Sequence, residues 1–344
     1  MREIYVAGCP SYVGGADTEL YHQVLLWRSE GIPVVIVPNS ANTINSQIKH
    51  EMELIGCEIK EYYHGIFNKK TVVNYCNGPA LILLNNELPE NYIFFNCMTW
   101  VFDEEIKHIR TGKITHLGFV SNYQKELLIK EYAKVLEIKE IIPGTNFPRL
   151  LDYYPFFDIS KFNVINKTNE YFGIGRISRD DPAKFSTDCW NIFDRVLSPI
   201  PKKIFVLGYN NKIEEKIGKP PPSLDYIWWN PGMISSVDFY SRIDCLIHKT
   251  GGSRESYCRV LIEAMAYGIV PLVERDYAFP EILANNSELD WCMCRSSDEM
   301  SYKASELAFN VDKLQHYKSV VRAYAENHIV NRTKSIQGWL KLLV

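Results

Sequence analysis

Residues 255–268 read Glu-Ser-Tyr-Cys-Arg-Val-Leu-Ile-Glu-Ala-Met-Ala-Tyr-Gly, and this stretch decides how the rest of the chain is interpreted. Apolar residues recur at helical spacing between two carboxylates, Glu255 and Glu263, so the stretch predicts an amphipathic helix. Gly268 is typical of a helix end, and the apolar residues 270–273 are typical of a buried strand. On one helix the two carboxylates would lie about 12 Å apart along the axis and about 80° apart around it. We therefore predict that they contact two parts of one extended polar ligand.

A glycine-containing loop precedes this helix. Residues 248–254 read His-Lys-Thr-Gly-Gly-Ser-Arg and follow an apolar stretch that predicts a strand. Gly251 and Gly252 give the backbone freedom, and the N-terminus of the following helix favours negative charge. The loop therefore predicts a site for phosphate groups. The sequence lacks a Walker A loop, so ATP hydrolysis of that type is not supported.

A charged turn follows the first strand predicted in the second half of the chain. Arg176 stands at the carboxyl end of this strand, where parallel sheets bind their ligands. Arg179 and Lys184 follow within the same loop. Arginine binds phosphate oxygens in a fork and lysine adds a point charge, so the turn predicts a diphosphate site. A solvated loop, in which Arg179 pairs with Asp180 and Asp181, is the alternative.

A third turn, near the start of the chain, contains paired glycines. Residues 14–19 read Gly-Gly-Ala-Asp-Thr-Glu, and they follow a predicted strand over 4–7 and lead into a predicted helix over 17–30. Such glycines let the backbone approach a ligand closely. The spacing differs from that of the dinucleotide-binding fingerprint, which disfavours NAD. A plain tight turn remains the alternative.

The composition is that of an ordinary globular protein. With 344 residues the chain is long enough for two domains, and its net charge of −3 gives no general attraction to nucleic acid. The nine cysteines are scattered, which indicates reduced thiols. The sequence has no secretory pattern and no apolar run long enough to span a bilayer. We therefore expect a cytoplasmic protein without a transmembrane segment, and leave peripheral membrane association and the oligomeric state open.

Strand and helix patterns alternate twice along the chain. This alternation predicts two parallel sheets with helices on both faces, joined by a proline-containing connection over 142–162. The predicted strands cover 4–7, 33–38, 80–84, 92–95, 115–120, 171–175, 203–207, 244–248 and 270–273. Helices are predicted over 17–30, 121–132 and 314–344. We divide the chain into an N-terminal Rossmann-like domain over 1–155, a second one over 156–325 and a C-terminal helix over 326–344.

In this order, the motifs resemble the retaining GT-B glycosyltransferases, and family 4 in particular. The resemblance rests on Gly14-Gly15-Ala16-Asp17-Thr18-Glu19, Val120-Ser121, Ile142-Pro143-Gly144, Gly175-Arg176, the stretch 255–268 and Pro280-Glu281-Ile282. It covers nearly the whole chain, and the stretch 255–268 is its most specific part. The resemblance implies two Rossmann-like domains that face each other across a cleft, with the C-terminal helix returning to the first domain.

The resemblance also implies roles for individual residues. Glu263 would bind the ribose of a nucleotide, and Glu255 would face the donor sugar. Arg176 and Lys184 would neutralise the diphosphate, and these two cations with Glu255 form the catalytic set. Gly15 would let the first domain close on the phosphates and the sugar. The donor-binding set comprises Gly14, Gly15, Arg176, Arg179, Lys184, Gly252, Ser253, Arg254, Ser256, Tyr257, Arg259, Val260 and Glu263.

The implied activity is transfer of a sugar from a nucleotide-diphosphate-sugar to an acceptor hydroxyl, with retention at the anomeric carbon. A UDP-sugar is favoured over a GDP-sugar as donor, and neither a metal nor a further cofactor is expected. The acceptor is a glycan or a small molecule in preference to a modified DNA base. A basic and aromatic patch over 62–64 and 68–70 would suit nucleic acid, but a solvated loop explains it better.

Three departures from the family pattern keep alternatives open. Asp181 stands where the family usually has the phosphate-binding lysine, so the charge would come from Lys184 or Arg179. Residues 277–279 read Tyr-Ala-Phe where the family often has two glycines, and residues 95–100 lack the family histidine. A non-catalytic nucleotide- or glycan-binding partner protein and a nucleotide-sugar epimerase are therefore the alternative functions. A phosphorylase of this fold would be expected to be larger.

Overall fold

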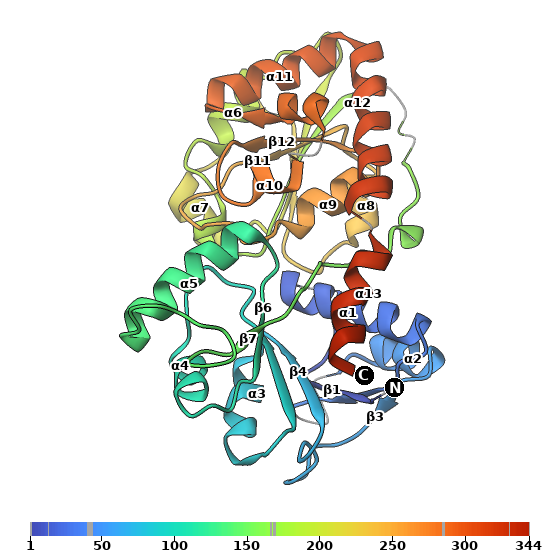
Figure 1. The fold of residues 1–344 in the computed structure, drawn as a ribbon. Helices are drawn as coiled ribbons and strands as arrows, with labels where there is room; N and C mark the ends of the chain where they lie inside the picture. The colour runs from blue at the N-terminus through green and yellow to red at the C-terminus, as the bar shows by residue number, and fades with distance from the viewer. Residues whose placement is uncertain are drawn as a thin grey trace. The chain divides into compact units, whose positions relative to one another are not determined.

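The chain forms two compact units, each with one parallel sheet flanked by helices, in a computed structural model (Figure 1). The structure describes residues 2–12, 14–39, 44–165, 167, 170–283, 286–329 and 331–343. One unit consists of Met1–Asp158 with Asn331–Val344, and the other of Ile159–Val330. The prediction of two Rossmann-like α/β domains is confirmed.

The first unit has a seven-stranded sheet in the order β3-β2-β1-β4-β5-β6-β7. Its strands are β1 (Ile4–Ala7), β2 (Val34–Val37), β3 (Glu58–Ile59), β4 (Thr71–Tyr75), β5 (Asn91–Phe95), β6 (His116–Gly118) and β7 (Arg149–Leu150). Every residue of β1, β2 and β4 is buried, as expected for parallel strands that helices cover on both faces.

Helices cover both faces of this sheet, and the last one comes from the end of the chain. They are α1 (Gly15–Ser29), α2 (Ser46–Leu54), α3 (Gly78–Leu83), α4 (Asp103–Arg110), α5 (Asn122–Leu136) and α13 (Arg332–Leu343). Trp339 of α13 packs edge-on against Trp27 of α1, with ring centroids 4.8 Å apart, and its indole nitrogen donates to Gln23 at 3.1 Å. The predicted return of the C-terminal helix to the first domain is thus confirmed (Figure 1).

The predicted strand over 80–84 is wrong, because this segment lies mostly in helix α3. Asn77 accepts a hydrogen bond from the amide of Ala80 at 3.0 Å, and Pro79 fits the first turn of the helix. The strand that occupies this place in the sheet is β4, which pairs with β1 and β5. It was missed because Asn74 interrupts its apolar run, although the side chain is buried and donates to the Tyr92 hydroxyl at 3.2 Å.

The second unit has a six-stranded parallel sheet in the order β10-β9-β8-β11-β12-β13. Its strands are β8 (Phe172–Ile177), β9 (Lys202–Leu207), β10 (Tyr226–Trp229), β11 (Cys245–His248), β12 (Val270–Glu274) and β13 (Met293–Cys294). Within this unit, β8 comes first in the sequence, and β9 and β10 follow on one side of it. The chain then crosses to the other side of β8, where β11, β12 and β13 complete the sheet. The strand order therefore reverses between β8 and β11, which is where sheets of this kind bind ligands beyond the carboxyl ends of their strands.

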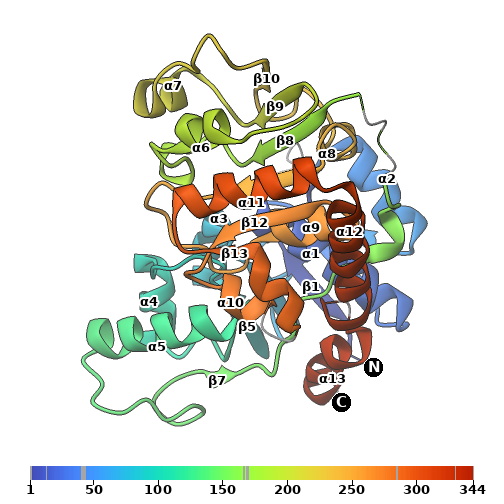
Figure 2. The same cartoon turned by 90° about the horizontal axis from the view of Figure 1, so that it is seen from above.

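Seven helices belong to the described part of this unit. They are α6 (Cys189–Arg195), α7 (Asn211–Ile217), α8 (Ser236–Tyr240), α9 (Arg259–Ala266), α10 (Phe279–Leu283), α11 (Ser297–Phe309) and α12 (Val311–Tyr324). Helices α11 and α12 both pack against β12 (Figure 2). The helix predicted over 314–344 is not continuous, since a π-helical turn over Ala325–Ile329 follows α12 before α13 begins. In the described ranges, no helix combines the length and apolar character that crossing a bilayer requires.

Candidate functional site in the second unit

Four polar side chains meet beyond the carboxyl ends of β8 and β11. Arg176 comes from β8, Lys184 from the short 3-10 helix Pro182–Lys184, His248 from the end of β11, and Glu255 from the loop before α9. Charged groups are seldom buried unless they are paired, so this buried cluster at the strand ends is a candidate site.

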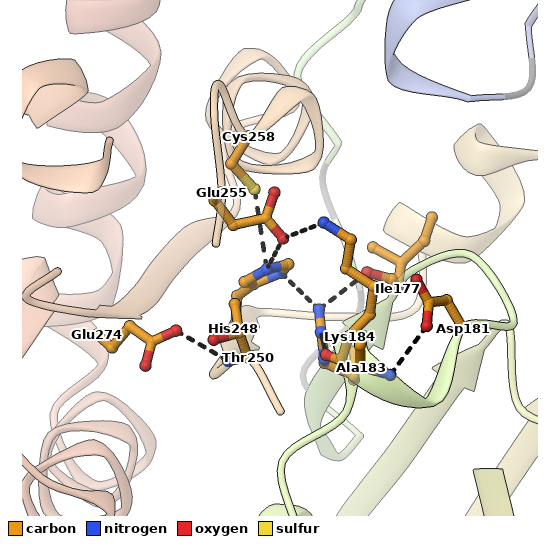
Figure 3. A network of polar contacts seen from close by, with 10 residues as sticks. Ile177, Asp181, Ala183, Lys184, His248, Thr250, Glu255, Cys258 and Glu274 are labelled. Atoms are coloured by element: carbon orange, nitrogen blue, oxygen red, sulfur yellow. Dashed lines mark hydrogen bonds and ion pairs between the residues drawn. The ribbon is translucent and has the colours of Figure 1, made fainter. Parts of the chain in front are cut away.

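Glu255 is the centre of the cluster. Its Oε1 atom lies 2.8 Å from Lys184 Nζ and 3.3 Å from His248 Nε2. Figure 3 shows the Lys184 and His248 side chains both pointing toward this carboxylate. The Lys184 and Glu255 side chains are only 16% and 10% exposed, so solvent weakens this ion pair little. One carboxylate oxygen thus faces two donors.

Arg176 determines which nitrogen of His248 carries the proton. Its guanidinium Nη1 donates to His248 Nδ1, and arginine has no acceptor, so Nδ1 must be unprotonated. The proton of the neutral imidazole therefore sits on Nε2 and is donated to Glu255. Burial, followed by the charge of Arg176, lowers the pKa of His248 to about 4, so the ring is neutral near pH 7.

Glu255 is a carboxylate at neutral pH. Burial raises its pKa, but the hydrogen bond with His248 and the charge of Lys184 outweigh this effect and hold the pKa well below its ordinary value. A strongly shifted pKa with specific charge partners is typical of functional sites.

Arg176 itself is 1% exposed and faces the protein interior. Its Nη1 also donates to the Ile177 carbonyl at 3.0 Å, its Nη2 donates to the Lys184 carbonyl, and its guanidinium lies over the Phe185 ring at 5.1 Å. Its buried Nε has no hydrogen-bond partner among the residues that the structure describes. In this arrangement Arg176 fixes the loop that carries Lys184. That it binds a diphosphate in a fork remains a prediction.

The turn that contains Ala183 and Lys184 is held against the loop that contains Gly251 and Ser253. The amides of Gly251 and Ser253 both donate to the Ala183 carbonyl at 3.0 Å. Lys216 of α7 donates to the carbonyls of Pro182 and Gly251, one in each loop, at 2.7 Å. A Cβ atom at Gly251 would lie 1.9 Å from the Phe185 carbonyl oxygen, so glycine is required for this close approach.

The prediction that Glu255 and Glu263 lie on one helix is wrong. Helix α9 begins at Arg259, and Cys258 before it has an extended backbone, with φ −74° and ψ 91°. The Glu255 carbonyl accepts from the Ala278 amide at 3.3 Å, which ties it to the segment before α10. Since Glu255 lies outside the helix, the predicted helical spacing of the two carboxylates does not apply.

Glu263 does lie on α9 and is partly exposed. Burial raises the pKa of its carboxyl, while the charge of Arg259 and a hydrogen bond with Tyr240 lower it in part. The Tyr240 hydroxyl also donates to the Val260 carbonyl at 3.1 Å, so it is fixed against the helix.

The structure separates the two candidates for the missing family lysine. Lys184 contacts Glu255, whereas Arg179 is exposed beyond the end of β8. Asp181, which stands at the family lysine position, accepts from the Ala183 amide at 2.9 Å and caps the short helix that carries Lys184. Asp181 therefore helps to hold the turn that brings Lys184 into the cluster.

The other predicted donor-binding residues are dispersed around this cluster or lie elsewhere. Gly252 and Arg254 are exposed, and Ser256, Tyr257 and Val260 are partly exposed. Ser253 Oγ is buried and has no hydrogen-bond partner among the described residues. Gly14 and Gly15 lie in the first unit at the start of α1, where Gly14 has φ 91°.

His248, Glu255 and Cys258 are the one group in the described parts of the chain with metal-ligand spacing, their ligand atoms lying within 4.8 Å of one another. The group does not suit a cation. Nε2 of His248 carries a proton, and the ammonium group of Lys184 already neutralises Glu255. Burial raises the pKa of the Cys258 thiol well above its ordinary value, so the thiol is protonated.

Several solved structures share this architecture over the full length of the chain. HepE from Anabaena, solved with UDP and glucose, superimposes with a TM-score of 0.70 at 12% identity over 99% of both chains. The chain has the GT-B fold. WaaG, a glycosyltransferase involved in lipopolysaccharide biosynthesis, matches with a TM-score of 0.65 at 12% identity over 99% of both chains. A TarM variant from S. aureus, in complex with fondaparinux, alpha-GlcNAc-glycerol and UDP, gives 0.70 at 10% identity over 99% of both chains.

The likeness is one of structure and not of sequence. No protein-family model matches the sequence. The search of curated proteins gives no match either. The GT-B fold predicted from the motifs is thus supported by three-dimensional similarity over the full chain.

His248 is the member of the cluster that sequence reasoning missed. The loop 248–254 was predicted to bind phosphates through its glycines, and no role was given to the histidine. The signal that could have found it is its position, since it ends a buried strand next to the point where the strand order reverses.

Proposed function

We propose that this protein is a glycosyltransferase that moves a sugar from a nucleoside diphosphate to an acceptor hydroxyl. The observation that carries the proposal is the buried group of Arg176, Lys184, His248 and Glu255 at the strand-order reversal of the second sheet. HepE, whose structure is similar, was solved with UDP-glucose, which favours a UDP-sugar over a GDP-sugar as donor.

Each end of such a donor has a suitable partner in the second unit. Glu263 on α9 would accept hydrogen bonds from the ribose hydroxyls, which favour the ionised carboxylate. Lys184 would turn from Glu255 to the diphosphate and neutralise the charge that grows on it as the glycosidic bond breaks. The positive end of the α9 dipole would act in the same sense.

Glu255 would then face the donor sugar. Its carboxylate accepts hydrogen bonds only, so it suits sugar hydroxyls and the positive charge that develops near the anomeric carbon. We propose that the diphosphate leaves from the face at which the acceptor hydroxyl arrives, so that configuration is retained. Arg176 and Lys184 with the helix dipole would supply the positive charge that a metal ion supplies in other transferases.

We assign the donor to the second unit and the acceptor to the first unit. In the first unit, Gly14 precedes α1 and Gly15 is its first residue, and both would allow close approach of the backbone to a ligand. A glycan or small-molecule hydroxyl is the proposed acceptor, in preference to a modified DNA base.

Thermal unfolding with a panel of UDP-, GDP- and ADP-sugars tests the proposal, because a ligand bound only by the folded state raises the unfolding temperature. We expect UDP-sugars to stabilise the protein and to be hydrolysed slowly to UDP without an added acceptor. Stabilisation without turnover of any donor would instead indicate a non-catalytic nucleotide-binding protein. Interconversion of the sugar without its release would indicate an epimerase.

A matched pair of variants makes this experiment specific. Lys184→Met should abolish most of the turnover, whereas Lys212→Met, at an exposed position on α7, should leave it unchanged. Equal turnover in both variants would place the diphosphate elsewhere.

A further inference from the structure

We propose that His248 is a positioning residue of this donor site, which keeps Glu255 oriented toward the sugar once Lys184 has turned to the diphosphate. This inference rests on the proposed function, and it concerns a residue to which the sequence motifs assign no role.

The geometry around Glu255 carries the inference. Lys184 Nζ and His248 Nε2 approach the same oxygen, Oε1, at 2.8 and 3.3 Å. When Lys184 leaves, His248 is the donor that remains on Oε1, and Oε2 stays available for a sugar hydroxyl. Without His248, a buried carboxylate would lose both donors, and an unsatisfied buried charge is strongly unfavourable.

His248 is itself held in the orientation that this task needs. Arg176, a permanent cation, donates to Nδ1 and so keeps the proton on Nε2. The Phe279 ring packs edge-on against the imidazole, with centroids 5.6 Å apart at 68°, which restricts rotation of the ring. A tautomer fixed by a partner on the second nitrogen is the arrangement by which a histidine orients the group it contacts.

Other titratable groups near this contact do not replace His248. Cys258 Sγ lies 3.9 Å from Nε2, and burial keeps its thiol protonated. Glu274 of β12 accepts from the Thr250 amide at 2.9 Å and is thereby engaged in the loop (Figure 3). The other charged groups at this contact are Lys184, which donates to Glu255, and Arg176, which donates to His248. His248 is therefore the neutral donor to Glu255.

Three substitutions separate positioning from simple packing. His248→Gln places an amide N–H near the position of Nε2 and keeps the donor to Glu255. His248→Asn reaches only the Nδ1 position, facing Arg176, and His248→Leu fills the space without either contact. We expect His248→Gln to retain donor-hydrolysis kcat within about threefold, and the other two to lose about 10- to 100-fold, with little change in donor KM.

The pH profile gives a readout that packing would not change. Loss of the donor to Glu255 raises the pKa of Glu255, so the acid limb of kcat should lie at higher pH in His248→Leu than in His248→Gln, both of which lack the titrating imidazole. Equal kcat in wild type and His248→Leu would overturn the inference while leaving the proposed function intact. Equal losses in the Gln and Leu variants, with unchanged pH profiles, would also overturn it.

A measurement without turnover tests the same arrangement. Nitrogen-15 spectra of histidine-labelled protein, with the His248 signal assigned from His248→Gln, should show the neutral Nε2–H tautomer at pH 7. A protonated ring or an Nδ1–H tautomer would overturn the inference. Failure of every nucleotide-sugar to bind or react with the wild type would contradict the proposed function instead, whatever these spectra show.

Discussion

Lys184 has two roles in this account, since it pairs with Glu255 in the free protein and with the diphosphate during the reaction. Lys184→Met should lower kcat for donor hydrolysis by about 100-fold, because a charged hydrogen-bond donor to the leaving group is lost. The variant should also lose stability, since removal of one partner leaves a largely buried carboxylate with one donor fewer. Donor-hydrolysis kinetics and urea unfolding check both effects, with Lys212→Met as the control. Normal kcat in Lys184→Met would contradict this role.

His248 makes the stability of the protein depend on pH. The pKa of a histidine is about 6.5 in the unfolded chain and is lowered to about 4 here, so the unfolded state binds more protons between these values. Stability contributed by the neutral ring is therefore present above pH 6.5 and is lost as the pH falls toward 4. Urea unfolding of wild type and His248→Gln at several pH values between 7 and 4 should show a steeper loss in the wild type. His50→Gln, at an exposed position, is the control and should follow the wild type.

At the scale of elements, the close approach of the two loops depends on Gly251. Gly251→Ala places a Cβ atom 1.9 Å from the Phe185 carbonyl, so the loops must separate and Lys184 must move. We expect donor turnover to fall at least about tenfold, because small displacements of positioning groups reduce rates strongly. The control is Gly78→Ala at the start of α3, where an added Cβ meets nothing within 4 Å. Turnover unchanged in Gly251→Ala would show that this loop contact is not needed.

The elements also show how far the sequence could predict the structure. Strands β1, β2, β8, β9 and β11 were placed correctly because they are short apolar runs between turn residues. The helix that contains Glu263 was predicted, but its first turn was not, because residues 255–258 take a course set by tertiary contacts. No local pattern encodes the bond between Glu255 and the Ala278 amide.

The candidate site was predictable only in part, because local sequence patterns indicate residues but not their tertiary contacts. Lys184 and Glu255 were expected near the donor, and they form an ion pair across 71 positions of the sequence. That Arg176 would be buried and bonded to His248 was not expected, because burial depends on how Phe185 and the neighbouring strands pack around it. The order of the motifs therefore predicted which residues lie near the site, whereas the contacts among them could be seen only in the folded structure.

At the scale of the whole molecule, the last helix completes the first unit. Trp339 is fully buried against Trp27 and donates to Gln23. Trp339→Ala should destabilise the first unit by about 3–5 kcal/mol, through the cavity and the unsatisfied amide that it leaves. Urea unfolding should then show a lower midpoint for the first unit than in the wild type. Trp100→Ala, at a half-exposed position, is the control. An unchanged midpoint would mean that α13 contributes little to the stability of the first unit.

The central claim is that the second unit holds a nucleoside-diphosphate donor site, and calorimetric titration of UDP tests it most directly. The account predicts that one UDP binds per chain, and that Lys184→Met and Glu263→Ala each weaken this binding at least about tenfold, while Lys212→Met does not. If neither UDP nor another nucleoside diphosphate binds, or if UDP binds equally well to all three variants, the claim is contradicted.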